Sequence, residues 1–450
     1  MLPAVFLQRN RKHQKIRGTL SVIIGNETCK LKKAEGETKM RKTAVLSIFL
    51  AGTGLLAACS SGEEGEAQAW LEEDWEAINA EADGSDVRMF MWGGDDGLNQ
   101  YMDEYVIPTV EQEHNIDLER VPIDTEESLQ RLLTEKEAGE QEGTMDILWL
   151  NGENFRAAKE NELLLGSFTE KLPHFNEYID ADSPETTLDF GTPTEGMESP
   201  LGKVQFTFIY DTEKVDQPPA TWEELRLWAE DNPGEFTYPE ATDFTGNAFL
   251  RQLLYDQYGN DEAFASEAFD EEALEENTEP MWDYLNELEG SLWREGQTYP
   301  ASVEELDRLY SRGEVSMTMG YNEARAESLI RDGTFPETTD TFMLDSGSIG
   351  NTHFLTMPFN AGNPAGAMVV MDFLLSPEAQ IEKMNPDGWG ESSVLDPALL
   401  TEEDRRAMEA VDRGASVPSQ EELDNAYLPE LDADYVGWLE EKWNNEVVQP

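Results

Sequence analysis

Four polar loops, each placed after a predicted strand, hold the residues best suited to binding a small molecule. The loops span residues 92–95, 151–154, 243–246 and 321–323, and they combine aromatic rings with carboxylates and amides. An aromatic face attracts an organic cation, and a carboxylate pairs with its charge. Arg294, beside Trp293, favours an anion instead, because a guanidinium grips carboxylates and phosphates through two hydrogen bonds. The candidate ligand-binding residues are Trp92, Asp95, Asn151, Glu153, Asn154, Gln205, Asp243, Phe244, Thr245, Trp293, Arg294, Tyr321, Asn322, Glu323 and Asn351.

Several of these residues also have a purely structural interpretation. Trp92 fits a hydrophobic core, Asp95 and Asp243 fit helix caps, and Asn151 fits a turn closed by its own side chain. One loop alone is therefore weak evidence. The prediction depends on four loops that all occupy strand-end positions.

The segments before these loops predict an α/β fold. Short apolar runs at 87–92, 116–121 and 145–150 indicate buried strands, and helical patterns follow them. Alternation of strands and helices favours a parallel sheet. In such sheets ligands bind beyond the carboxyl ends of the strands, which is where the polar loops lie.

Chain length and pattern together predict two domains. Residues 60–450 exceed what one hydrophobic core ordinarily serves. Residues 203–210 alternate with period two, as expected of a long strand that crosses from one domain to the other. Residues 353–357 are the expected return crossing.

The search for a catalytic or metal centre gives a negative result. The four histidines, His13, His114, His174 and His353, include no pair at metal-ligand spacing, and the sequence has no nucleophile elbow. Close pairs of carboxylates carry little weight in so acidic a chain. We therefore expect no enzyme activity, no cofactor and no resident metal.

Residues 40–59, MRKTAVLSIFLAGTGLLAAC, predict a lipoprotein signal peptide. Arg41 and Lys42 supply its positive start, and the apolar stretch that follows is too short to span a bilayer comfortably. Small side chains then precede Cys59, as a lipoprotein signal peptidase requires. The protein is thus expected on the outer face of a bacterial membrane or in the periplasm, with a lipid on Cys59.

This signal also defines the expected N-terminal segments. The true start is expected at Met40, so residues 1–58 comprise an upstream extension and the signal peptide. Residues 59–85 are expected to form an acidic tether and a helix. The chain has two cysteines, Cys29 and Cys59, so no disulfide is possible once the first is removed and the second carries lipid.

The charge of the chain excludes one class of partner. The formal net charge is −62, and 11 of the 32 basic residues precede Cys59, whereas only three of the 94 acidic residues do. Such self-repulsion destabilises a protein in dilute buffer and is screened in molar salt, so we interpret it as adaptation to high salt. Nucleic acid is excluded as a partner, because phosphate contacts need clustered basic side chains.

Longer blocks of the chain resemble one family of ABC-importer components, the YnjB-like periplasmic solute-binding proteins. The extra N-terminal segment and the acidic surface depart from the family pattern but do not touch these blocks. Two short stretches, PPATWEEL (218–225) and FLLSPEAQ (373–380), are similar to helix openings in many solute-binding components. The long blocks are DILWLNGENFRAAKENELL (146–164), TPTEGMESPLGKVQFTFIY (192–210), FTYPEATDFTGNAFLRQLL (236–254), LWREGQTYP (292–300), IGNTHFLTMP (349–358) and WGESSVLDP (389–397).

The resemblance implies a two-lobed, type II periplasmic-binding-protein-like α/β fold with two hinge crossings. It places residues 86–200 and 345–395 in the first lobe, 201–344 in the second, and C-terminal helices of 396–450 on both. Such a protein captures a solute between its lobes and delivers it, as a monomer, to a membrane permease driven by an ATPase.

The resemblance does not settle the ligand, because more distant relatives bind thiamine, polyamines, ferric iron or oxyanions. The aromatic and carboxylate candidates predict a small organic cation such as thiamine or a polyamine. An anion held by Arg294, or a metal held by Tyr321 and His353, stays an alternative. A lipid-anchored hydrolase and a surface adhesin are less favoured functions.

Overall fold

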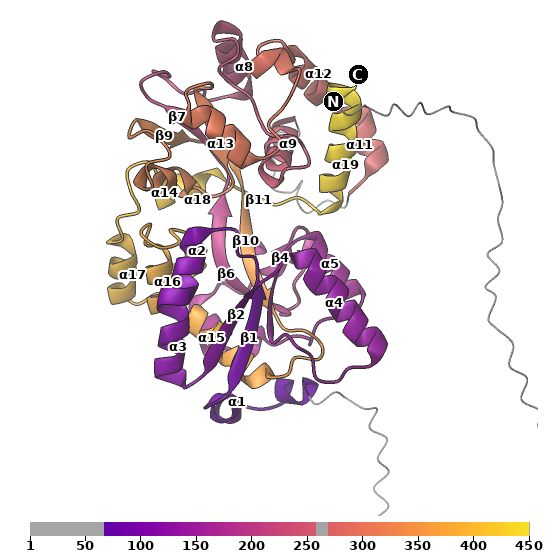
Figure 1. Ribbon diagram of the computed structural model, residues 1–450, viewed down its shortest axis with the longest axis vertical. Coiled ribbons are helices and arrows are strands. Elements are labelled where there is room, and N and C mark those ends of the chain that lie inside the picture. Colours follow the sequence, from indigo (N-terminus) through magenta and orange to yellow (C-terminus); the bar gives the residue numbers. More distant parts are fainter. Residues whose placement is uncertain (1–66, 258–268, 450) are drawn as a thin grey trace, which may run out of the picture. The chain divides into compact units, whose positions relative to one another are not determined.

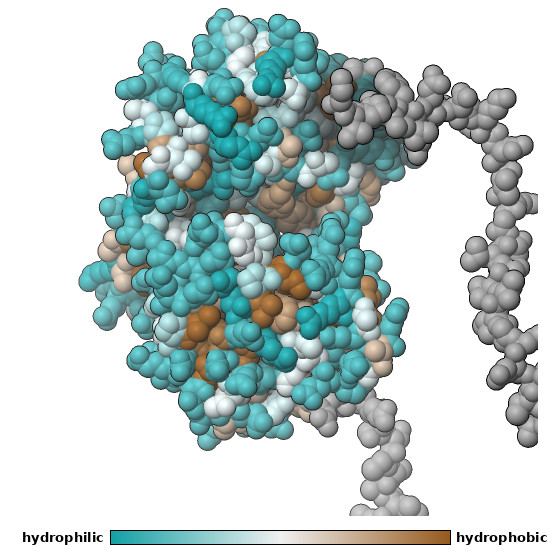
Figure 2. Space-filling model, in the orientation of Figure 1, coloured by the Kyte–Doolittle hydropathy of each residue, from teal (hydrophilic) through white to brown (hydrophobic). Residues whose placement is uncertain are grey.

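The computed structural model describes residues 67–257 and 269–449. The predicted signal peptide, Cys59 and the first part of the acidic stretch after residue 260 lie outside the described residues. Residues Ser61–Pro450 form one compact unit, whose helices and strands are drawn in Figure 1. The face of the molecule drawn in Figure 2 is mostly hydrophilic.

The first sheet has six strands in the order β11-β10-β3-β1-β2, and β6 pairs with β10. β1 pairs in parallel with β2 and β3, whereas β10 runs antiparallel to β3 and β6. The parallel strands confirm the predicted alternation of strand and helix. The strands are β1 (Asp86–Met91), β2 (Asp117–Pro122), β3 (Ile147–Leu150), β6 (Glu198–Gln205), β10 (Ser348–Thr356) and β11 (Tyr427–Pro429).

Side chains of the parallel strands alternate between two hydrophobic clusters. Met89 and Met91 of β1 join one cluster with α1, α3 and α15, whereas Phe90 joins the other with α4 and α5. Because successive strand residues point to opposite faces, helices cover both sides of the sheet (Figure 1). These helices are α1 (Trp75–Ala82), α3 (Ile107–His114), α4 (Thr125–Ala138), α5 (Glu153–Glu160) and α15 (Pro364–Leu374).

The second sheet is antiparallel, in the order β8-β7-β9, and has a core of its own. Aromatic rings fill this core: Phe208 stacks on Phe342, and Tyr238 stacks on Phe249. Its elements are β7 (Thr207–Asp211), β8 (Met317–Gly320), β9 (Thr339–Phe342), α8 (Trp222–Asp231), α9 (Phe244–Gln257), α12 (Glu279–Glu289), α13 (Val303–Ser311) and α19 (Asp434–Trp443).

Two segments pass between the sheets, as predicted. β6 of the first sheet leads through Phe206 into β7 of the second, and β9 leads back into β10. Phe206 interrupts the long predicted strand, and its N–H donates to the carbonyl O of Ile349 at 2.9 Å. The return strand begins earlier than expected, at Ser348.

The C-terminal segment contains more than the expected helices. β11 pairs in parallel with β10 of the first sheet, and α19 packs in the core of the second. The remaining elements are η1 (Gln68–Leu71), α2 (Asp96–Gln100), η2 (Tyr101–Val106), η3 (Thr169–Lys171), α6 (Pro173–Tyr178), α7 (Pro184–Thr187), β4 (Leu188–Asp189), β5 (Thr192–Pro193), α11 (Glu271–Asn277), η4 (Trp293–Gly296), α14 (Arg325–Arg331), α16 (Pro377–Lys383), α17 (Glu402–Glu409), α18 (Gln420–Ala426) and η5 (Asn444–Val448).

Candidate functional site

Two of the predicted aromatic residues are exposed, one from the region of each sheet. The loop of Trp92 follows a strand as predicted, but the described residues 212–243 contain no strand before Phe244. Trp92 follows β1 and is 48% exposed, and Phe244 begins α9 and is 52% exposed. The core interpretation of Trp92 is therefore wrong. The ring of Phe244 lies 5.1 Å from that of Tyr321, which brings two of the predicted loops together.

The two aspartates of the predicted loops both cap helices, as their structural interpretation allowed. Asp95 Oδ1 accepts from the N–H of Leu98 at 2.7 Å, at the start of α2. Asp243 uses both oxygens, accepting from the N–H of Gly246 at 2.9 Å and of Val303 at 3.1 Å. Asp243 is thus committed to the backbone, whereas Asp95 caps with one oxygen.

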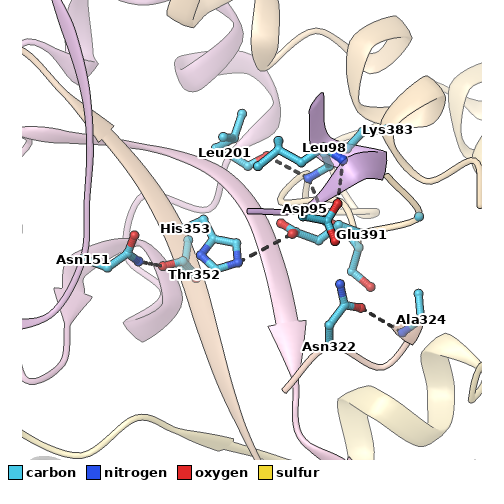
Figure 3. Close-up of polar contacts among 12 residues, drawn as sticks. Asp95, Leu98, Asn151, Leu201, Asn322, Ala324, Thr352, His353, Lys383 and Glu391 are labelled. Atoms are coloured by element: carbon cyan, nitrogen blue, oxygen red, sulfur yellow. Dashed lines mark hydrogen bonds and ion pairs between the residues drawn. The ribbon is translucent and has the colours of Figure 1, made fainter. Parts of the chain in front are cut away.

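A buried group of ionisable side chains lies where β6 and β10 pair. We call it the pivot cluster, and it consists of Glu323, His353, Lys383, Glu391 and Arg413. His353 Nε2 lies 3.5 Å from Glu391 Oε2, and Arg413 Nη2 lies 2.7 Å from Glu323 Oε1. Figure 3 shows the Glu391 carboxylate facing the His353 ring.

A β-bulge supplies the hydrogen-bond partner of the buried lysine. His353 pairs with Gly202 and Phe354 pairs with Pro200, so Leu201 is the extra residue of β6. Its carbonyl O accepts from Lys383 Nζ at 2.7 Å (Figure 3). Gly202 makes room for the cluster, because a Cβ there would lie 1.7 Å from Glu391 Oε1.

Burial moves three side chains of the pivot cluster, Lys383, His353 and Glu391, toward their neutral forms. It lowers the pKa of Lys383 to about 7 and, with Lys383 nearby, that of His353 to about 3. It raises the pKa of the Glu391 carboxyl well above its usual range, and Lys383 opposes this rise. Glu391 Oε1, His353 Nδ1 and Arg413 Nε have no hydrogen-bond partner within the described chain. The hydrogen-bonding capacity of these three atoms is therefore not satisfied by the described residues.

A second buried ion pair lies next to the aromatic loop residues Phe244 and Tyr321. Arg251 donates to both oxygens of Glu430, at 2.9 and 2.8 Å, and Tyr321 donates its O–H to the same carboxylate at 2.5 Å. Burial, together with Glu430, keeps the pKa of Tyr321 well above its usual range, so the phenol keeps its proton. The guanidinium carbon lies 5.8 Å from the centre of the Phe244 ring.

Asn151 is tied to the return strand rather than to its own turn. Its Nδ2 donates to the carbonyl O of Thr352 at 2.7 Å, as Figure 3 shows. Its Oδ1 is buried and has no hydrogen-bond partner among the described residues. An unpaired acceptor of this kind suits a group that donates hydrogen bonds.

Most other predicted residues are buried or hydrogen-bonded to the backbone. Asn322 Oδ1 accepts from the N–H of Ala324 at 2.8 Å, and Glu323 accepts from the N–H of Gln205 at 3.0 Å. Glu153 is exposed at the start of α5, and Asn154 is half-buried in the same turn. The remaining residues of this group, Gln205 on β6, Thr245 on α9 and Asn351 on β10, are buried.

Trp293 and Arg294 stand apart from the other candidates. The N–H of Trp293 donates to the carbonyl O of Phe236, which precedes the loop of Asp243 and Phe244. The Arg294 guanidinium is exposed and lies 3.9 Å from the centre of the Trp293 ring. No hydrogen bond or ion pair within the described chain joins Arg294 to the other candidate residues.

Sequence reasoning missed several of the buried charged residues of the site. Glu391 lies within the block WGESSVLDP, so family resemblance had marked its neighbourhood without assigning it a role. Arg251 likewise lies within the block 236–254 without an assigned role. Arg413 and Glu430 gave no signal, because their charged partners are distant in sequence, and Lys383 gave none either.

Two searches of the described residues gave negative results. None of their helices is long and apolar enough to cross a membrane. Within the same residues, no three histidine, cysteine, aspartate or glutamate side chains gather as a metal site requires.

Comparison with known proteins relates this geometry to importers. Residues 106–403 match the family model described as bacterial extracellular solute-binding protein. Protein YnjB of Escherichia coli K12 is 39% identical over 375 residues, which cover 82% of this chain and 93% of YnjB.

Solved structures show the same fold at low identity. The spermidine/putrescine ABC transporter substrate-binding protein PotD of Streptococcus pneumoniae is 16% identical, with a TM-score of 0.55 over 80% of this chain and 98% of PotD. The apo ferric ion-binding protein A of Pasteurella haemolytica is 12% identical, with a TM-score of 0.55 over 81% of this chain and 98% of that protein. The fold is thus the two-lobed α/β fold of periplasmic binding proteins. The chain belongs to the bacterial extracellular solute-binding proteins, non-catalytic components that capture a small molecule outside the cytoplasm for the permease and ATPase of an ABC importer.

Proposed function

We propose that the chain captures a small organic cation between its two lobes, such as a polyamine or thiamine. The observation that carries the proposal is the exposure of Trp92 on the first lobe and Phe244 on the second. A cation placed over an aromatic face gains about 0.5–2 kcal/mol, and more when water is excluded. Because one ring comes from each lobe, the ligand contacts both rings only when the lobes close around it, and its binding therefore stabilises the closed form.

The charges near these rings support a cation over an anion. Arg251 is paired with Glu430, and Arg413 is paired with Glu323, so their guanidinium groups already have carboxylate partners. Arg294, the residue that favoured an anion, stacks on Trp293. Asp95 and the unpartnered Oδ1 of Asn151 add negative charge and a hydrogen-bond acceptor for an ammonium group.

A metal ligand has less support. Tyr321 donates its O–H to Glu430 and holds its proton, which disfavours a tyrosinate ligand. His353 Nε2 faces Glu391. One solved relative is named for spermidine and putrescine and another for ferric ion, so the shared fold favours neither class.

A thermal-shift screen followed by calorimetric titration tests the proposal. The compact unit Ser61–Pro450 would be screened at low and molar salt against putrescine, spermidine, thiamine, phosphate, sulfate, citrate and ferric ion. A ligand at 100 times its Kd adds about 2.7 kcal/mol of stability, which raises the melting temperature measurably. Binding of an anion, with none of the cations bound, would overturn the proposal.

Variants of the two rings sharpen this test. Trp92→Ala and Phe244→Ala are each expected to weaken binding of the cation about tenfold, since each removes one aromatic face. Leu227→Ala is the matched control, because Leu227 is also a large exposed apolar residue of the second lobe. Asp95→Asn keeps an acceptor for the helix cap while it removes the charge. Unchanged affinity in both ring variants would contradict the proposed site.

We also propose that the protein is a monomer held at the membrane through a lipid on Cys59, which lies outside the described residues. The support is the sequence of residues 40–59. Cys59→Ser should move the protein from the membrane fraction to the soluble fraction and abolish labelling by radioactive palmitate. Labelling that persists in the variant would refute the anchor. Size-exclusion chromatography tests the monomer.

A further inference from the structure

A strained hairpin of the first lobe reaches the second lobe. β4 and β5 are joined by Phe190 and Gly191, whose φ angles are +43° and +74°. Two positive φ angles define the tight hairpin turn in which asparagine and glycine are preferred. A phenylalanine in that position is strained by its Cβ, so the surrounding contacts must hold it there.

The hairpin is fixed on both sides of its tip. Asp189 Oδ2 accepts from the N–H of Gly152 at 2.6 Å, which ties the hairpin to the loop after β3. The carbonyl O of Phe190 accepts from the N–H of Ala433 at 3.3 Å. Gly191 approaches the backbone of Asp432 so closely that a Cβ would lie 3.1 Å from its Cα. The tip therefore bridges the strand-end loop of the first lobe and the segment before α19.

The Phe190 ring fills the space between a candidate loop and a buried cation. It occupies the position that a side chain on Gly152 would need, since a Cβ there would lie 3.3 Å from the ring. Its other neighbour is Arg251, whose guanidinium carbon lies 5.7 Å from the ring centre. The same guanidinium lies 5.8 Å from the exposed ring of Phe244. The Arg251 guanidinium thus lies near one phenyl ring from each lobe.

We propose that Phe190 is a positioning residue that couples the loop of Asn151 and Gly152 in the first lobe to Arg251 and Phe244 in the second. A ligand that orders the loop of Asn151 and Gly152 also fixes the Phe190 ring. The Phe190 ring in turn holds the Arg251 guanidinium next to Phe244. This inference rests on the proposed function for its effect on affinity. Its effect on lobe placement needs no ligand.

Spin labels measure lobe placement directly. Residues 61–450 contain no cysteine, so Leu133→Cys on α4 and Leu227→Cys on α8 give one exposed label on each lobe. The distribution of distances between the labels would be recorded by double electron–electron resonance without ligand, with and without Phe190→Asn. Asparagine tolerates the positive φ angle and lacks the ring. A broader distribution in the variant is expected.

Affinity for the cation found in the screen provides the second readout. Phe190→Asn should raise its Kd at least tenfold, whereas Phe190→Tyr, which keeps the ring, should stay within threefold. Phe190→Gly replaces the asparagine variant if that variant does not fold. An unchanged distance distribution overturns the coupling, even if the melting temperature falls, because that combination marks a merely structural residue. Failure of the wild-type protein to bind any cation overturns the proposed function, and the label distances still decide the role of Phe190.

Discussion

The candidate site contains two buried arginine–carboxylate pairs whose hydrogen bonds are completed differently. Arg251 and Glu430 are 1% and 4% exposed, and two parallel hydrogen bonds join them. Tyr321 donates a further hydrogen bond to the Glu430 carboxylate, and the side chain of Asn247 accepts one from Arg251. Arg413 instead reaches Glu323 through Nη2, and its buried Nε has no hydrogen-bond partner in the described chain.

This difference separates a rigid part of the site from an adjustable one. A buried ionic network whose groups are all satisfied is rigid, and breaking it is costly. The pair beside Phe244 and Phe190 belongs to that class. The pivot cluster contains three unpartnered atoms next to the crossing strands, so its hydrogen bonds can be exchanged when the lobes move or a ligand arrives.

The largest expected effect comes from removing one carboxylate of each pair. Glu430→Ala leaves Arg251 buried and unpaired and should lower the free energy of unfolding by about 3–5 kcal/mol. Glu323→Ala should cost about 1–3 kcal/mol, because the 11% exposed Arg413 still donates to the carbonyl O of Gly390. Denaturant unfolding in molar salt measures both. Equal costs would remove the distinction between the two pairs.

An alkaline test concerns the hairpin beside the rigid pair. Burial raises the pKa of Asp189 to about 8, so its folded-state value lies above the unfolded one. The stability that this carboxyl contributes is therefore present below about pH 4 and is lost as the pH rises to 8. Asp189→Asn, which still accepts from Gly152, should be more stable than the wild type by several kcal/mol at pH 9 and no more stable at pH 4. A variant with the wild-type pH profile would contradict the assignment.

An acid test concerns the pivot cluster. The pKa of His353 is lowered to about 3, so between pH 3 and 6.5 the unfolded chain binds a proton that the folded chain does not. The contribution of His353 is present above pH 6.5 and is lost as the pH falls toward 3. His353→Gln should remove several kcal/mol of the stability loss between pH 6.5 and pH 3. Nuclear magnetic resonance titration of the imidazole checks the pKa itself, and a value near 6.5 would refute this account.

The smallest expected effect calibrates the others. Arg406 and Glu402 form an ion pair on α17 with side chains 73% and 75% exposed. Arg406→Ala should change the free energy of unfolding by no more than about 0.5 kcal/mol, because water and salt screen exposed pairs. A larger loss of stability would mean that exposed ion pairs also contribute strongly, so the costs measured for the buried pairs would not reflect their burial.

The sequence predicted the elements whose signals are local. Apolar runs marked β1, β2 and β3, and alternation marked the strands that pass between the sheets. Loops 92–95, 151–154 and 321–323 follow β1, β3 and β8 as predicted, whereas no strand of the described chain directly precedes 243–246. The last two loops meet where Phe244 touches Tyr321. Local patterns suffice here because strand periodicity and turn residues act over a few neighbours.

The buried charges could not be predicted in the same way. Arg251 and Glu430 are 179 residues apart, and Arg413 and Glu323 are 90 apart, so no local pattern pairs them. Arg294, which favoured an anion, lies over its own neighbour Trp293, a contact that its sequence position allows but does not reveal. Phe190 gave no signal either, because its conformation is imposed by contacts with Gly152 and Ala433.

The late position of β11 and α19 has a consequence for biosynthesis. β11 completes the first sheet, and Tyr435, Trp438 and Trp443 complete the core of the second. The core of the second sheet cannot close before these residues have been synthesised, although domains otherwise fold from the N-terminus as the chain emerges. A nascent chain that lacks them is slow to acquire a stable tertiary structure inside the cell. That delay suits a protein whose work lies beyond the membrane, because an unfolded chain passes through a narrow export channel and a closed two-lobed body does not.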